Sequence, residues 1–168
     1  ITGLIGENIS YGFNITKIDD AFVSPSTLTY PDARFPGGQA SLGLDAKQYL
    51  PMFADTSYSF YFEYAYKTDL FGGGDSFVRL QHSYNGDSLN QLSDGSNSPR
   101  QEQGDYMVTD IVMGYDLGDW KAQLSVNNIN DERGVSYKDS SDFDPYYGRN
   151  SNNVIRPRNF SLSLRRFF

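Results

Sequence analysis

The chain has 168 residues, no cysteine and a net charge of −7, and 15% of its residues are aromatic. The length fits one domain, the missing cysteines exclude disulfides and thiolate metal sites, and the acidic balance argues against a nucleic-acid partner. The sequence has no run of about 18 apolar residues, which excludes a membrane-spanning helix. The mean hydropathy of −0.55 still permits a membrane β-barrel, because barrel strands are apolar on one side only.

The first part of the chain predicts one complete strand and a long loop. Residues 1–7 look like the end of an earlier strand and a turn. Residues 8–18 alternate apolar and polar side chains with the period of two that is typical of a strand. We expect its apolar set to face lipid: Ile9, Tyr11, Phe13 and Ile15. Residues 19–54 are rich in proline, which removes donors from a β-ladder, so they predict a loop, with a short hairpin around residues 40–44 as an option.

The middle of the chain predicts two strands and a second loop. Residues 55–67 carry aromatic side chains at every second position, which a helix would scatter around its circumference: Tyr58, Phe60, Phe62, Tyr64 and Tyr66. Residues 68–75 contain three consecutive glycines and predict a short turn, and residues 76–85 alternate again as the returning strand. Residues 86–104 are polar and rich in Asn, Ser, Asp and Gln, which is typical of an exposed loop.

The last third of the chain predicts three more strands. Residues 105–116 and 120–129 alternate in the same way and are joined by a tight turn. Residues 130–156 predict a third long loop. Residues 157–168 predict a closing strand that ends on an aromatic residue. The six predicted strands have about 10–13 residues each, close to the length that a tilted strand needs to cross a bilayer.

The connections between these strands alternate between long and short. Outer-membrane barrels have short periplasmic turns and long outer loops. Residues 68–75 and 117–119 therefore predict the periplasmic side, and the three long loops predict the extracellular side. Aromatic side chains gather at the periplasmic ends, where a membrane girdle belongs: Tyr64, Tyr66, Tyr115, Trp120 and Phe168. The sequence thus predicts an all-β, antiparallel transmembrane β-barrel.

Several stretches resemble TonB-dependent outer-membrane receptors. Residues 120–131, W-K-A-Q-L-S-V-N-N-I-N-D, are similar to the penultimate strand of that family, which runs from a tryptophan to an Asn-Leu-Phe-Asp ending. Residues 109–115 are similar to the strand before it, and residues 157–160 resemble the Pro-Arg-x-Phe start of its closing strand. Residues 47–51 and 84–86 also fit, so the resemblance spans essentially the whole chain.

The resemblance implies a plugged barrel of about 22 strands. Such receptors import a scarce ligand, such as an iron chelate, cobalamin or a glycan, with energy passed through TonB. Six strands cannot close a barrel, because the smallest have about 8. We therefore expect residues 1–168 to be the C-terminal segment of a larger receptor, whose plug domain, earlier strands and targeting signal would precede Ile1.

The same resemblance implies a location and a set of partners. The expected location is the outer membrane of a Gram-negative bacterium. The expected partners are outer-membrane lipid, the TonB complex through the missing N-terminal plug region, and a small-molecule or glycan ligand. The barrel-insertion machinery is a further expected partner, because it recognises a terminal aromatic strand in this class of protein.

Two groups of residues are candidate sites. We expect polar-face side chains to line the lumen: Tyr61, Glu63, Arg79, Gln81 and Asp110. Glu63 and Arg79 lie on adjacent predicted strands and are expected to form a salt bridge. In the third long loop, aromatic, arginine and acidic side chains are candidates for ligand contact, because aromatic residues and arginine are favoured at binding hot spots: Tyr146, Tyr147, Arg149, Asp142 and Asp144.

No metal site, cofactor or enzymatic activity is predicted. The carboxylates of residues 139–144 are clustered as calcium prefers, but the run lacks the glycine and terminal glutamate of an EF-hand loop, so a solvated acidic loop is favoured over a calcium site. His82 is the only histidine and is expected to be structural. One histidine and no cysteine leave no visible pair of nucleophile and base, so we expect a protein that is not an enzyme.

Two other functions fit the same strands. A passive porin would have the same strand chemistry and would admit solutes without TonB. A soluble all-β domain would hold a ligand in its loops, but the aromatic face of residues 58–66 would then be an exposed patch that favours aggregation. The transporter is therefore the preferred hypothesis.

Overall fold

The computed structural model describes the chain except residues 19–25, 32–38, 45–51, 91–100 and 140–150. Its main feature is one antiparallel sheet of seven strands, which we call the wall, in the order β1-β2-β5-β6-β9-β10-β13. The wall strands are β1 (Thr2–Ile5), β2 (Ile9–Lys17), β5 (Thr56–Thr68), β6 (Gly74–Asn85), β9 (Tyr106–Asp116), β10 (Trp120–Asn127) and β13 (Asn159–Arg166). Neighbours in the wall follow chain order, as in a meander, and the wall is an open sheet.

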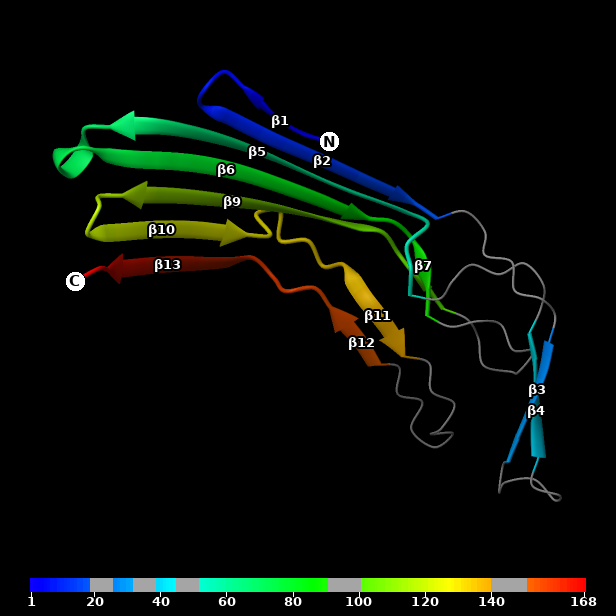
Figure 1. Cartoon of the computed structure of the whole chain (residues 1–168). Helices are drawn as coiled ribbons and strands as arrows, with labels where there is room; N and C mark the ends of the chain where they lie inside the picture. Colours follow the sequence, from blue (N-terminus) through cyan, green and yellow to red (C-terminus); the bar gives the residue numbers. More distant parts are fainter. Residues whose placement is uncertain (19–25, 32–38, 45–51, 91–100, 140–150) are drawn as a thin grey trace.

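Short turns close one end of the wall and long connections leave the other (Figure 1). The turn end carries the 3₁₀ helix η1 (Leu70–Gly72) and the turn at residues 117–119. The long-loop end carries three two-stranded hairpins: β3 (Ser26–Pro31) with β4 (Gln39–Leu44), β7 (Ser88–Leu89) with β8 (Glu102–Gln103), and β11 (Val135–Asp139) with β12 (Ser151–Val154). The predicted alternation of short and long connections is confirmed.

The predicted loops and strand ends need correction. Residues 130–156 and 86–104 were expected to be loops, but they contain paired strands, because polar side chains indicate exposure and do not prevent ladder pairing. β10 ends two residues early, since Asn128 has a φ of 52° and so leaves the extended conformation. β6 starts at Gly74, two residues before its predicted start. A short hairpin around residues 40–44 was only an option within the predicted 19–54 loop; the structure instead has β4 (Gln39–Leu44) paired with β3 (Ser26–Pro31), so part of that loop is a wider hairpin.

The register gives the wall two chemically different faces. Tyr11, Phe62 and Leu80 lie side by side in one row across β2, β5 and β6. In the neighbouring row, Tyr61 pairs with Gln81. Because side chains alternate between the two sides of a strand, mostly apolar rows share one side, the outward face, and mostly polar rows share the other, the inward face.

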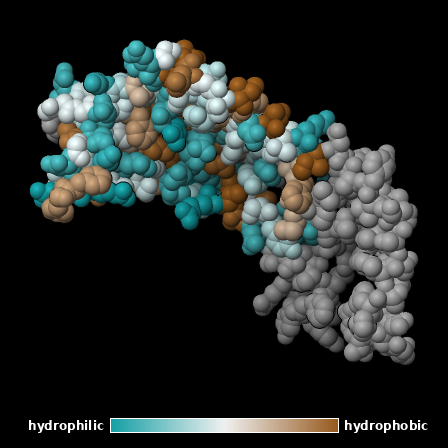
Figure 2. Space-filling view, viewed as in Figure 1, coloured by the Kyte–Doolittle hydropathy of each residue, from teal (hydrophilic) through white to brown (hydrophobic). Residues whose placement is uncertain are grey.

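The outward face is not covered by any part of the chain that the structure describes. Phe62 and Leu124, on inner strands, are each 43% exposed, and Leu162 is 68% exposed. Among the described residues, no hydrophobic side chain is fully buried. Figure 2 shows hydrophobic residues at the surface beside hydrophilic ones along the visible side of the sheet. Exposed apolar area costs about 25 cal/mol per Å² in water, so leaving this face in water is unfavourable.

Helices play almost no part in the fold. Within the described ranges, none has the length and hydrophobicity needed to pass through a bilayer.

Candidate functional site

The structure brings the predicted lumen residues together on the inward face. Tyr61 is paired with Gln81, Glu63 with Arg79, and Gln81 with Asp110 in the register of β5, β6 and β9. The predicted salt bridge is confirmed: Arg79 Nη2 lies 2.7 Å from Glu63 Oε2, and Arg79 Nε donates to the same oxygen at 2.8 Å. These residues share one face, and their contact with a barrel lumen stays a prediction.

A row of charged side chains crosses the inward face near the turn end. In register, Lys67 pairs with Asp75, Asp75 with Asp116, Asp116 with Lys121, and Lys121 with Arg165. Lys121 Nζ lies 2.6 Å from Asp116 Oδ2. The row also places two acids opposite each other and two bases opposite each other. Like charges directly opposite are unfavourable in a sheet, so within this row the Lys121–Asp116 ion pair is the favourable contact.

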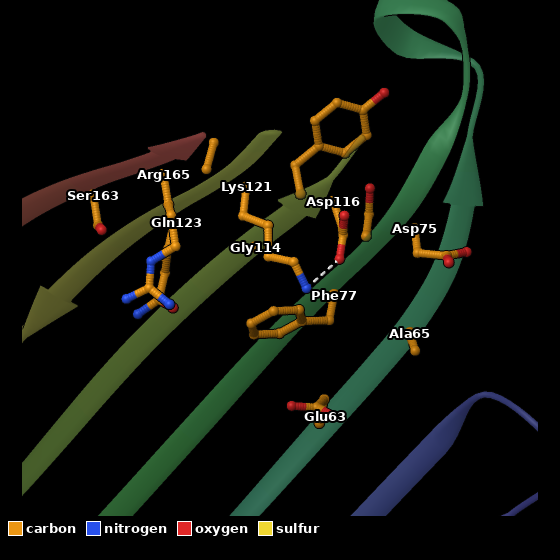
Figure 3. Close-up of a pocket in the computed structure, with 13 residues that line it drawn as sticks. Glu63, Ala65, Asp75, Phe77, Gly114, Asp116, Lys121, Gln123, Ser163 and Arg165 are labelled. Carbon is orange, nitrogen blue, oxygen red and sulfur yellow. Dashed lines mark ion pairs between the residues drawn. The ribbon is translucent and has the colours of Figure 1, made fainter. Parts of the chain in front are cut away.

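The charged row borders a hollow of about 410 Å³ on the inward face. Its lining residues come from β5, β6, β9, β10 and β13. Figure 3 shows their side chains around the hollow and marks the Lys121–Asp116 ion pair. Small residues form part of its lining, among them Ala65, Gly114 and Ser163. The lining of the hollow therefore combines charged side chains with small residues and the Phe77 ring.

Two glycines let aromatic rings lie flat on the inward face. A Cβ at Gly114 would overlap the Phe77 ring, its cross-strand neighbour (Figure 3). A Cβ at Gly12 would overlap the Tyr61 ring in the same way. Cross-strand coverage of a glycine by an aromatic ring is a known way to hold sheet register. The Phe77–Gly114 pair forms part of the lining of the hollow, and the Tyr61–Gly12 pair lines a separate, smaller one.

The predicted girdle residues lie near the turn end. The rings of Tyr64 and Tyr66 stack with centroids 5.5 Å apart. The Tyr115 hydroxyl donates to the Leu70 carbonyl oxygen of η1. The Arg166 guanidinium lies 5.2 Å from the Trp120 ring centroid and 4.8 Å from that of Phe168. Their contact with a membrane interface stays a prediction.

His82 is held among side chains that give it a structural setting. Its Nδ1 lies 2.8 Å from Thr109 Oγ1, and its ring stacks on Phe60 with centroids 5.1 Å apart. Over the described residues, no group of three or more His, Asp or Glu side chains is arranged to hold a metal.

The candidate ligand contacts lie outside the described residues, because all five fall within residues 140–150. At the long-loop end, the structure shows a hydrogen-bonded junction that the sequence did not predict. Asn128 and Asp131 form it where β10 ends and the β11–β12 hairpin begins. Asn128 is only 2% exposed, and Asp131 accepts a hydrogen bond from the Arg158 backbone N–H at 3.0 Å. The sequence signal was present, since both belong to the N-N-I-N-D run, but their role depends on partners far along the chain.

The junction also changes the acidity of its carboxylate. The hydrogen bond from the Arg158 N–H, followed by the Arg133 side chain and the charges of both arginines, lowers the pKa of Asp131, and partial desolvation opposes this shift only in part. Arg133 Nη2 lies 3.1 Å from Asp131 Oδ2. A lowered pKa means that the junction stabilises the fold above the ordinary aspartate pKa, and that this stabilisation is lost as the pH falls through the lowered value.

Comparison with known proteins adds a fold likeness. No family model matches the sequence, and no curated protein matches it. A solved structure does match: "Structure of the FpvAI-pyocin S2 complex". The superposition has a TM-score of 0.59 at 18% sequence identity and covers 98% of this chain but 18% of the matched chain. The chain therefore has the fold of one part of that structure and spans less than two thirds of its length.

Proposed function

We propose that residues 1–168 form the C-terminal part of the barrel wall of an outer-membrane receptor. The full protein would take up a scarce ligand, such as an iron chelate, cobalamin or a glycan, by TonB-dependent transport. The observation that carries this proposal is the two-faced wall: its apolar face is exposed, and no hydrophobic side chain of the described residues is fully buried. A soluble domain would leave this face in water, whereas a bilayer covers it.

The inward face supports the choice of a filled barrel over an empty pore. The charged row and the adjacent hollow offer paired charges and small side chains to a polar polypeptide surface. A plug region elsewhere in the full protein would meet these charges and would also provide the link to TonB. The fold likeness to part of a structure that contains a TonB-dependent receptor agrees with this assignment. Binding and passage of the ligand would require no chemical step.

An uptake experiment tests the proposal. Cells that produce the full-length protein are supplied with labelled ferric chelates, cyanocobalamin and oligosaccharides, with and without functional TonB. We expect accumulation of one class only when TonB and the proton-motive force are intact. Accumulation that persists without either would support the passive porin instead. Recovery of the protein from the soluble fraction in place of the outer membrane would reject both barrels.

A further inference from the structure

Asn128 sits at the point where β10 ends and a hairpin leaves the wall. Its φ of 52° turns the chain out of the strand. Its backbone N–H donates to Asp110 Oδ1 at 2.8 Å, which ties the turn to the neighbouring wall strand β9. The residue is 2% exposed, so its amide has little access to water and depends on protein partners.

The Asn128 side chain joins both roots of the β11–β12 hairpin, which we call the arm. Its Nδ2 donates to the Glu132 carbonyl oxygen, before β11, and to the Arg156 carbonyl oxygen, after β12, each at 3.0 Å. Its Oδ1 accepts from the Glu132 N–H at 2.9 Å. A single buried amide therefore fixes the outgoing and the returning chain at one place on the wall.

Asp131 also holds the base of the arm, through the chain that follows β12. It also has a left-handed backbone, with a φ of 51°. Its Oδ1 accepts from the Arg158 N–H at 3.0 Å, and Arg158 Nη1 donates to the Ile129 carbonyl oxygen at 3.3 Å. Ile155 N–H donates to the Gly134 carbonyl oxygen at 2.9 Å and closes the base of the arm. Several hydrogen bonds therefore hold both roots of the arm at the wall.

Beyond its roots the arm has one described polar tether to another hairpin. Lys138 Nζ donates to the Glu102 carbonyl oxygen of β8 at 2.6 Å. A two-stranded hairpin is marginally stable by itself, so its direction must be set where it is attached. A satisfied amide network is directional, and removing one member leaves buried groups without partners.

We propose that Asn128 is the positioning residue of the arm: its side-chain amide sets the direction in which β11 and β12 leave the wall. The arm projects from the long-loop end, which is the ligand side in the proposed function, so this inference extends that proposal and its functional consequence rests on it. Correct placement of the arm pre-organises the outer surface, and pre-organisation raises affinity by lowering the ordering cost of binding.

Spin-label distances test the positioning without any ligand. Residues 1–168 contain no cysteine, so Asn152→Cys in the arm and Leu117→Cys at the turn end provide a label pair in the full-length protein, with any cysteine outside these residues replaced by serine and the protein reconstituted in phospholipid vesicles. We expect one narrow distance distribution in the labelled parent and a broadened or shifted one in Asn128→Gly. Glycine keeps the left-handed backbone accessible, so this variant removes the side-chain bonds alone.

Asn127→Ala is the matched control. Asn127 Nδ2 donates to Asn159 Oδ1 at 2.9 Å, which is a contact within the wall between β10 and β13. We expect the distribution to stay narrow in this variant. Asn128→Asp, which keeps the acceptor but cannot donate from the former amide nitrogen, is a milder second variant if Asn128→Gly does not fold. A narrow, unshifted distribution in the folded Asn128 variant, or equal broadening in Asn127→Ala, would overturn the positioning role.

Uptake kinetics test the functional consequence. With the ferric chelate, cyanocobalamin or oligosaccharide that the parent protein transports, the folded Asn128 variant should raise the half-saturating concentration on the order of tenfold and leave the maximal rate unchanged. An unchanged half-saturating concentration would reject the link to binding. If the parent transports none of these compounds, the proposed function fails, while the distance measurement still decides the positioning role.

Discussion

The two faces of the wall are organised by different rules. On the outward face, neighbours match in kind, as in the row of Tyr11, Phe62 and Leu80. On the inward face, individual charged neighbours decide each contact: Arg79 complements Glu63, whereas Asp75 faces Asp116. Many apolar residues would therefore serve at such positions of the outward face, which the described residues leave exposed. The inward face is specified by particular partners, so a change there acts through one neighbour.

The largest effect is expected from a charge on the outward face. Leu124→Arg places a cation where the proposal puts hydrocarbon, and an arginine at the bilayer midplane of a barrel costs about 2–4 kcal/mol. We expect the folded fraction of the full-length protein in isolated outer membranes to fall sharply. The measurement is the proportion that migrates as the compact form in an unheated detergent gel.

The adjacent residue provides the control for this prediction. Gln123 precedes Leu124 on the same strand, lies on the inward face and lines the hollow. Gln123→Arg adds the same charge without exposing it to lipid, so its folded fraction should stay near that of the parent. If the folded fraction falls equally in Leu124→Arg and Gln123→Arg, the two faces do not differ in their exposure to lipid.

The second effect concerns one partner on the inward face. Gly114→Ala forces a Cβ into the Phe77 ring, and overpacking of this kind costs about 1–3 kcal/mol. We expect a lower urea midpoint for the full-length protein in phospholipid vesicles. Phe77→Ala should remove most of the penalty when the two changes are combined, because the obstructing ring is then absent.

A second glycine separates crowding from a general intolerance of alanine. Gly104 has no heavy atom within 4 Å of the place where its Cβ would lie. Gly104→Ala should leave the urea midpoint nearly unchanged. If Gly114→Ala still lowers the urea midpoint when Phe77 is also changed to alanine, then something other than the Phe77 ring limits the space above Gly114.

The wall was predictable from the sequence because its signal is local. The alternating aromatic residues of β5 indicate both the strand and its faces without knowledge of any partner. The short turns follow from glycine-rich or compact segments between alternating runs. The salt bridge of Glu63 and Arg79 was also accessible, since a short connection nearly fixes the register of two adjacent strands.

The remaining features depend on pairs that are distant in sequence. The contact of Phe77 with Gly114 requires the register between β6 and β9, which the long connection between them does not define. Asn128 gains its role from Arg156, at the far side of the arm. The strands β11 and β12 are short and polar, so their composition resembles that of an exposed loop. Local periodicity therefore predicted the wall and missed the junction.

The smallest effect is expected for the Glu63–Arg79 ion pair. The Glu63 side chain is 22% exposed and the Arg79 side chain is 44% exposed. A double-mutant cycle with Glu63→Gln and Arg79→Gln should give a coupling of about 0.2–1 kcal/mol, as exposed pairs do. The coupling should weaken as salt is raised, because ions screen exposed charges. The measurement is the difference in unfolding free energy among the four proteins in vesicles.

The size of this coupling also reports what lies against the inward face in the full protein. A pair that is open to water stays within the range of surface ion pairs. A segment seated over the charged row would exclude water from it, and charge interactions grow as the local dielectric falls. A coupling well above about 1 kcal/mol that resists added salt would therefore mean that such a segment covers the Glu63–Arg79 pair itself as well as the charged row. A small, salt-sensitive coupling would mean that water reaches this part of the inward face, and that the two faces of the wall differ as lipid and aqueous surfaces.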